Sequence, residues 1–234
     1  MHFIYANAWD KGDYYAKNQD SFGIQTVLTG SGPYGMAMIC DGVGSLDKGE
    51  YASGVVVREM TEWFYGCGLP LLCKGASKLK LWRSCRRGLQ AVHNQLAEIG
   101  TAQGIVVGTT FTMLILTRHR YYCFQVGDSS CFKVAGKIRI VGKRQVNEHG
   151  ELFGVVGAGE LPDIALQTGR YSSKHRFVLC SDGFVRCLTL QALKRVGDYR
   201  MSREQTQKLI YEIIDRGRRK GERDNCTVIV IGRK

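Results

Sequence analysis

The stretch MAMICDGVG at residues 36–44 decides the fold of this protein, because it joins a buried strand to an acidic turn. The run from Met36 to Cys40 is apolar and predicts a short strand inside the protein. Asp41-Gly42 follows directly and predicts a turn. The stretch RFVLCSDGF at residues 176–184 repeats this arrangement of an apolar run followed by Asp-Gly. The sequence therefore predicts buried strands that end in a carboxylate.

Further strands and helices surround these two runs. Apolar residues recur at three- and four-residue steps over residues 50–65 and 78–99, which predicts two long helices. Ser202 and Gln205 form a capping box that begins a later helix. Additional short strands are predicted at residues 22–28, 111–117, 121–126, 131–134, 137–141 and 226–231. The central ones are joined by short turns, so we expect a meander of antiparallel neighbours with helices packed outside the sheets.

Composition and length indicate one globular unit. The 234 residues are 44% apolar and 23% charged, and no linker or repeat divides them, so we expect a single domain over residues 1–234. No apolar run reaches the about 18 residues of a membrane-spanning helix, and the first residues lack the pattern of a signal peptide. The nine cysteines include no C-x-x-C pair, which favours buried, reduced thiols in a cytoplasmic protein without a membrane partner.

The net charge of +12 is concentrated in two basic clusters. The first comprises Lys74, Lys78, Lys80, Arg83, Arg86 and Arg87. The second comprises Arg216, Arg218, Arg219, Lys220 and Arg223. Such clusters attract acidic partners, and each also fits a solvated surface or a surface for protein docking. No zinc finger or RNA-recognition motif accompanies them, so we do not expect a nucleic acid partner.

Acidic residues stand at the ends of the predicted strands. Asp41, Asp128, Asp182 and Asp224 each have a small or turn-forming neighbour, and Asp20 precedes a strand. Carboxylates that meet repel one another, so a group of them at the rim of a core usually holds divalent cations. Oxygen ligands favour Mg²⁺ or Mn²⁺ over metals that prefer sulfur. Any one Asp-Gly pair alone is more simply a turn, so the prediction depends on the convergence of these carboxylates.

The acidic positions belong to a set of motifs, which run in order from residue 18 to residue 227. They are NQDSF at 18–22, CDGVG at 40–44, GEYAS at 49–53, GTT at 108–110, VGDS at 126–129, CSDGF at 180–184 and DNCT at 224–227. This order resembles that of the PP2C-type metal-dependent serine/threonine protein phosphatases (the PPM family), above all the bacterial members. The resemblance implies an α+β fold, a four-layer α-β-β-α sandwich of two antiparallel sheets flanked by helices.

The resemblance also implies a metal centre at one end of the sandwich, with two Mg²⁺ or Mn²⁺ ions and a weaker third ion. Asp41 would bridge the two ions, and the Gly42 carbonyl would bind the second of them. Asp20 would contact this second ion directly or through water. Asp182 and Asp224 would complete the first ion.

Two more residues take implied roles around this centre. Asp128 would hold the third ion together with Asp182, and Asn225 would support the ligands from behind. The shared ions lower the pKa of a bound water, which then attacks phosphorus in line. The implied catalytic residues are therefore Asp41, Asp182 and Asp224, which act through this water.

The sequence departs from the family pattern at the position that binds the substrate phosphate. Family members have an arginine three residues before the N-Q-D triplet, and this chain has Tyr15 there. Lys17 is the candidate replacement, although its point charge cannot reproduce the bidentate fork of arginine. Val43 stands where many eukaryotic relatives have histidine, and the flap that contacts substrate is short, with residues 150–159 as its glycine-rich remnant.

We therefore expect a monomeric phosphatase that acts on phosphoserine and phosphothreonine in proteins, with the targets of a serine/threonine protein kinase as its partners. The alternative is a pseudophosphatase that keeps the fold and binds or regulates phosphoproteins, which Tyr15 and the short flap favour. A nucleic-acid-binding protein would depend on the basic clusters alone, and its affinity would fall steeply with salt.

Overall fold

The computed structural model describes residues 2–44, 46–146, 148, 152 and 154–234, which form two antiparallel sheets of five strands each. The first sheet has the order β1 (Phe3–Asp10), β10 (Cys226–Arg233), β9 (Arg176–Cys180), β6 (Ser130–Ala135) and β7 (Lys137–Val141). The second has the order β2 (Asp20–Thr29), β3 (Gly32–Asp41), β4 (Phe111–Leu116), β5 (Arg120–Val126) and β8 (Ala165–Arg170). The two sheets face one another across an apolar layer.

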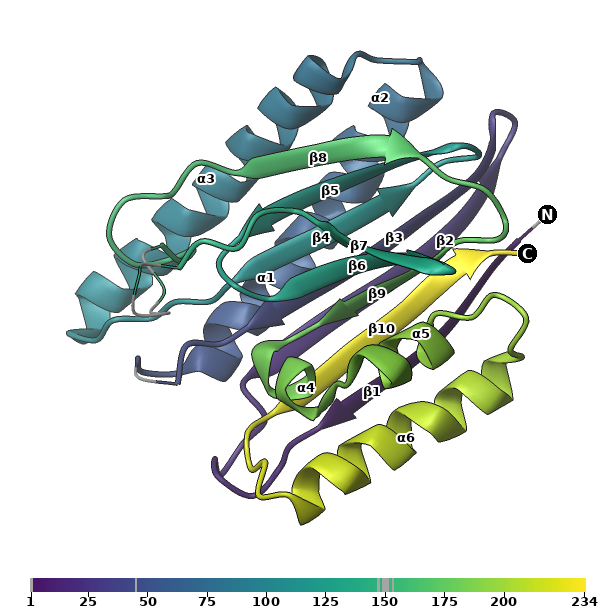
Figure 1. The fold of residues 1–234 in the computed structure, drawn as a ribbon. Coiled ribbons are helices and arrows are strands. Elements are labelled where there is room, and N and C mark those ends of the chain that lie inside the picture. The colour runs from purple at the N-terminus through teal and green to yellow at the C-terminus, as the bar shows by residue number, and fades with distance from the viewer. Residues whose placement is uncertain (1, 45, 147, 149–151, 153) are drawn as a thin grey trace.

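The helices form two groups, one outside each sheet (Figure 1). The group beside the second sheet comprises α1 (Gly49–Trp63), the π-helical turn η1 (Phe64–Gly68), α2 (Leu69–Cys73) and α3 (Lys78–Gln103). The group beside the first sheet comprises α4 (Asp182–Cys187), α5 (Leu190–Val196) and α6 (Arg203–Arg219). This arrangement confirms the predicted four-layer sandwich. Among the described helices, none is both long and apolar enough to cross a membrane.

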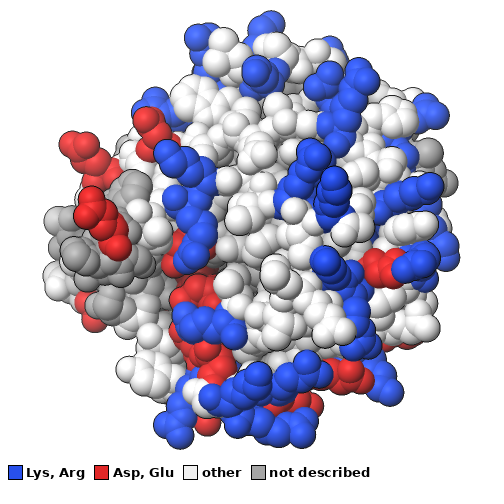
Figure 2. Space-filling view, in the orientation of Figure 1, with Lys and Arg blue, Asp and Glu red and all other residues white. Residues whose placement is uncertain are grey.

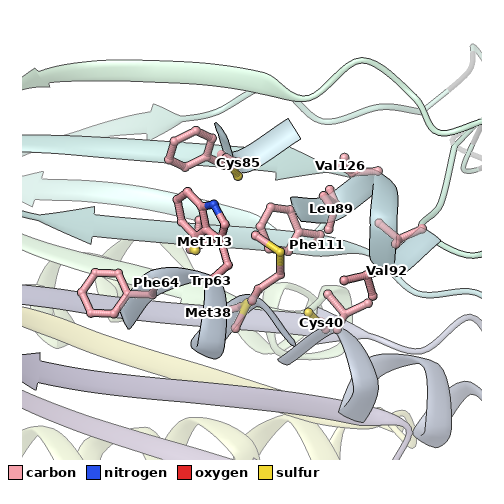
Figure 3. Close-up of a cluster of buried hydrophobic side chains, with 14 of the residues drawn as sticks. Met38, Cys40, Trp63, Phe64, Cys85, Leu89, Val92, Phe111, Met113 and Val126 are labelled. Atoms are coloured by element: carbon pink, nitrogen blue, oxygen red, sulfur yellow. The ribbon is translucent and has the colours of Figure 1, made fainter. Parts of the chain in front are cut away.

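The position of β3 explains why the run from Met36 to Cys40 does not alternate between apolar and polar residues. Met38 and Cys40 lie in the layer between the second sheet and its helices, whereas Ala37 and Ile39 lie in the layer between the two sheets. Figure 3 shows Met38 and Cys40 among side chains of α1 and α3. Because both faces of the strand are covered, apolar residues are needed at every position.

Met38→Ala is expected to lower the free energy of unfolding by about 2–5 kcal/mol, because Met38 is fully buried and its truncation leaves a cavity. Urea denaturation of the metal-free protein measures the change. Leu28→Ala serves as the control, since Leu28 is 78% exposed and its truncation should cost less than about 0.5 kcal/mol. A loss for Met38→Ala as small as that of the control would contradict the packing described here.

One predicted pairing is wrong, because β5 and β6 are not neighbours in one sheet. β5 pairs with β4 and β8, whereas β6 pairs with β7 and β9 in the other sheet. Gly127 between them has a φ of 97°, and a Cβ there would come within 2.7 Å of the Thr110 side chain. Residues 127–129 therefore carry the chain from one sheet to the other instead of folding it back. This crossing places Asp128 at the end of the sandwich.

Candidate metal and phosphate site

The aspartates that the sequence singles out lie together at one end of the sandwich. Asp20 and Asp41 are direct partners across β2 and β3. Asp128 lies in the crossing from β5 to β6, Asp182 begins α4 just after β9, and Asp224 precedes β10. All of them except Asp20 line one cavity of about 150 Å³. Asp20 is buried, with 1% of its surface exposed.

The threonines of the GTT motif fix the end of β3. The backbone N–H of Asp41 donates to Thr110 Oγ1 at 2.9 Å, and its carbonyl accepts from the Thr110 N–H at 2.8 Å. Thr109 Oγ1 donates to the same carbonyl at 2.9 Å. Gly42 follows in a space without room for a side chain, since a Cβ would lie 2.5 Å from the backbone of Gly49. The backbone N–H and carbonyl of Asp41 therefore both have hydrogen-bond partners, and Asp41 lines the cavity.

Burial, together with the charges of neighbouring carboxylates, raises the pKa values of three aspartates at the site. Burial raises the pKa of Asp41 well above its usual range, and the charges of Asp20 and Asp182 raise it further. Burial also raises the pKa of Asp20 to about 6 and raises that of Asp128. Both side-chain oxygens of Asp20 are buried and have no hydrogen-bond partner among the described residues. The end of the sandwich therefore carries more negative charge than its own groups compensate.

Arg186 is the cation that the sequence analysis missed. Its guanidinium reaches Asp182 Oδ2 at 2.5 Å, Asp224 Oδ2 at 2.6 Å and Glu222 Oε2 at 2.7 Å. It lies on α4 four residues after Asp182, and this i,i+4 spacing in the sequence was the available signal. Arg186 therefore links two of the predicted metal ligands to each other.

The residues present fit a hard divalent cation. The donors are carboxylate oxygens and backbone carbonyls, which suit Mg²⁺ or Mn²⁺. The unpartnered oxygens of Asp20 and the raised pKa of Asp41 both indicate a site that lacks positive charge. Within the described ranges, no three acidic, histidine or cysteine side chains are close enough together to hold an ion as they stand. Arg186 spans Asp182 and Asp224 in this arrangement.

Asn225 connects the site to the N-terminal loop. Its Oδ1 accepts from the Gln19 N–H at 2.8 Å, and its Nδ2 donates to the Lys11 carbonyl at 2.6 Å. Its own N–H donates to Asp224 Oδ1 at 2.7 Å. Asn225 thus orients Asp224 and holds the loop that leads to Asp20.

Tyr15, and not Lys17, lines the cavity. The Tyr15 ring packs against Gly44, where a Cβ would collide with the phenol. Burial raises the pKa of Tyr15, and the charge of Asp224 adds to this, so its hydroxyl stays protonated. Lys17 is largely exposed, and its Nζ lies 2.8 Å from Glu50 Oε1.

The expected flap remnant at residues 150–159 falls partly outside the described residues, which omit 150, 151 and 153. Leu152 lines the cavity. Val156 exchanges two backbone hydrogen bonds with Thr109, at 2.9 and 3.0 Å. The described part of this segment is therefore fastened to the GTT motif beside the site.

The sequence profile of one family, protein phosphatase 2C, matches residues 15–215. The chain belongs to the protein phosphatase 2C family. This confirms the predicted resemblance and the predicted class of enzyme. The matched range includes Asp20, Asp41, Asp128 and Asp182, whereas Asp224 lies just beyond it. A comparison with curated protein sequences gives no match.

Several solved structures of bacterial phosphatases have the same fold as this chain. A structure described as a bacterial serine phosphatase has a TM-score of 0.82 at 18% identity, over 100% of this chain and 98% of that one. The serine/threonine phosphatase Stp1 from Staphylococcus aureus gives 0.82 at 18%, over 100% and 96%. The serine/threonine phosphatase PstP from Mycobacterium tuberculosis gives 0.74 at 20%, over 99% of each chain. At such identities the likeness concerns the fold, and it confirms the two-sheet architecture.

Proposed function

We propose that this protein is a metal-dependent phosphatase that hydrolyses phosphoserine and phosphothreonine in proteins. One observation carries the proposal: four aspartates from distant parts of the sequence surround one cavity in a chain of the 2C family. A cavity of about 150 Å³ lined by carboxylates would repel a phosphate dianion unless cations were bound there. The function therefore requires the ions that these carboxylates suit.

In this proposal two Mg²⁺ or Mn²⁺ ions bind at the end of the sandwich. Asp41 would help to hold both ions, and Asp182 and Asp224 would hold the first. The Gly42 carbonyl and Asp20 serve the second. When bound, the ions supply a water acidic enough to act as a nucleophile near neutral pH.

The remaining residues position the ligands and the substrate. Asp128, whose carboxylate lies 3.7 Å from Arg144, would hold a weaker third ion together with Asp182. Asn225 fixes the orientation of Asp224 through the hydrogen bond described above. The protonated Tyr15 hydroxyl donates to a phosphoryl oxygen, in place of the arginine of the family pattern. Lys17 would reach the phosphate only after leaving Glu50.

Phosphate release from matched phosphothreonine and phosphotyrosine peptides in Mn²⁺ tests the proposed substrate class. We expect release from the phosphothreonine peptide at least about tenfold faster, a difference in barrier of about 1.4 kcal/mol. Equal rates would contradict the substrate class. The pseudophosphatase is the second candidate, and it is favoured by Arg186, which bridges two proposed ligands. Its signature would be binding of the phosphothreonine peptide without any release.

We propose that the substrates are proteins phosphorylated by a serine/threonine kinase. The phosphatase would act on them as a monomer in the cytoplasm. The basic half of α3 is a candidate docking surface for acidic partners. Arg83, Arg86 and Arg87 line a groove there with Trp82, and the Arg86 guanidinium lies 5.9 Å from the Trp82 ring centre. None of these residues lines the cavity that the aspartates surround.

The triple variant Arg83→Glu/Arg86→Glu/Arg87→Glu is expected to lower kcat/KM for phosphorylated casein, an acidic protein, by about tenfold, because the reversed charges repel it. Its kcat/KM for p-nitrophenyl phosphate should stay within about twofold, since this small substrate does not reach α3. Steady-state assays on both substrates measure the effect. Equal loss on the two substrates would contradict docking at α3.

A further inference from the structure

Two chain segments are fastened together beside the cavity. The N–H groups of Asp13 and Tyr14 donate to the Arg223 carbonyl at 3.0 and 3.1 Å. Gly12 adopts a φ of 66°, and a Cβ there would collide with the carbonyl oxygens of Arg223 and Asp224. The N-terminal loop and the turn after α6 therefore form one rigid edge of the site.

This edge carries basic side chains that the fold does not neutralise. We define the basic rim as Lys11, Arg216, Arg219, Lys220 and Arg223, all of them exposed. Among the described residues, none of these side chains forms a salt bridge with a carboxylate. Figure 2 shows Lys and Arg side chains gathered along the lower edge of the molecule, below a strip of acidic ones.

Two acidic residues on the segments that carry the rim are paired with other arginines. Asp10 pairs with Arg218, and Glu222 pairs with Arg186. Asp13 and Asp215 remain as exposed carboxylates on the same segments, so the rim keeps an excess of positive charge.

An exposed aromatic side chain lies between the rim and the cavity. Tyr14 is 68% exposed, and its ring packs edge-on against Tyr15 with 4.7 Å between the ring centres. Tyr15 in turn lines the cavity. Tyr14 and Arg223 of the rim therefore lie on the side of the cavity that Tyr15 lines, where they are accessible to residues that flank a bound phosphorylated residue.

We propose that the basic rim binds acidic residues that flank the phosphorylated residue of the substrate. The proposal rests on the proposed phosphatase function and names its preferred substrates, phosphopeptides rich in aspartate and glutamate. The helix dipole favours basic residues at the end of α6 and accounts for part of this charge. It does not account for Lys11 and Arg223, which lie outside the helix. The rim therefore has an excess of charge that complements an acidic ligand.

The test compares the variant Arg216→Glu/Arg219→Glu/Lys220→Glu with the wild type and with the α3 triple variant, which changes the charge equally. The substrates are short phosphothreonine peptides flanked by glutamate or by lysine, and p-nitrophenyl phosphate. For the rim variant we expect kcat/KM to fall at least about tenfold on the glutamate peptide and to rise on the lysine peptide. Its p-nitrophenyl phosphate hydrolysis should stay within about twofold. The α3 variant should resemble the wild type on both short peptides.

If these residues only stabilise the helix, the rim variant will have a lower melting temperature but an unchanged ratio of kcat/KM values for the two peptides. This result would overturn the proposal. The milder Arg216→Gln/Arg219→Gln/Lys220→Gln variant gives the same comparison if the glutamate variant does not fold.

A wild type that hydrolyses no substrate would refute the phosphatase function and leave the rim testable by binding. Fluorescence anisotropy of labelled glutamate and lysine phosphopeptides in Mn²⁺ measures this binding, since a protein that hydrolyses no substrate leaves the peptides intact. Tighter binding of the glutamate peptide, lost in the rim variant, would support the rim. No preference between the peptides, or tight binding of a labelled oligo(dT) alone, would overturn it.

Discussion

Asp41→Asn is expected to lower kcat on a phosphothreonine peptide by about 10³-fold or more. Asp41 lies at the end of β3 and lines the cavity, and burial together with the surrounding carboxylates raises its pKa well above its usual range. In our account it contacts both ions, whose Lewis acidity contributes several kcal/mol to catalysis, and each 1.4 kcal/mol corresponds to about tenfold in rate. Steady-state phosphate release in saturating Mn²⁺ measures the loss.

The stability of the same variant separates loss of catalysis from loss of the fold. Burial and the neighbouring carboxylates raise the pKa of Asp41, so its ionised form destabilises the metal-free protein at neutral pH. Asparagine removes this charge, and we expect a melting temperature at least equal to that of the wild type in EDTA. Asp198→Asn is the matched control, because Asp198 pairs with Arg200 and should leave kcat unchanged. Activity of Asp41→Asn within tenfold of the wild type would contradict the assigned role.

Arg186→Gln is expected to tighten Mn²⁺ binding about tenfold. The guanidinium contacts Asp182, Asp224 and Glu222, so an ion that takes the first two carboxylates must compete with it. These groups are partly exposed, which limits each contact to about 1 kcal/mol or less. A tenfold change in affinity, about 1.4 kcal/mol, is therefore a reasonable sum for the two contacts with Asp182 and Asp224.

Isothermal titration with Mn²⁺ measures the affinity directly and needs no turnover. Arg200→Gln is the matched control, because it also removes an arginine from a carboxylate pair, at Asp198. Weaker Mn²⁺ binding by Arg186→Gln would contradict competition and would instead make Arg186 a residue that orients Asp182 and Asp224.

Much of the fold could be predicted because its strands and helices are marked locally. The apolar run of β3 and the helical periodicity of α3 are properties of short windows, and Ser202 with Gln205 forms the predicted capping box. The strand β8 escaped prediction because its sequence, ALQTGR, is polar and only partly buried. The short helices α4 and α5 span less than the about 10 residues that periodicity needs.

The crossing between β5 and β6 could not be predicted, because a short turn usually returns a strand to its neighbour. Here the close approach of Gly127 to Thr110 directs the chain to the other sheet, and this tertiary contact is not visible in the local sequence. The same limit applies within the site. The positions of the aspartates at the ends of predicted strands suggested a cluster, but only the folded chain places Arg186 between Asp182 and Asp224.

Phosphate release from a phosphothreonine peptide, before and after metal removal, tests the central claim most directly. The protein is stripped with EDTA, checked for folding by circular dichroism, and assayed alone and after addition of Mn²⁺ or Mg²⁺. We predict no release from the stripped protein and full recovery with either ion. Undiminished release in EDTA, or no release from folded protein at any metal concentration, would contradict the account.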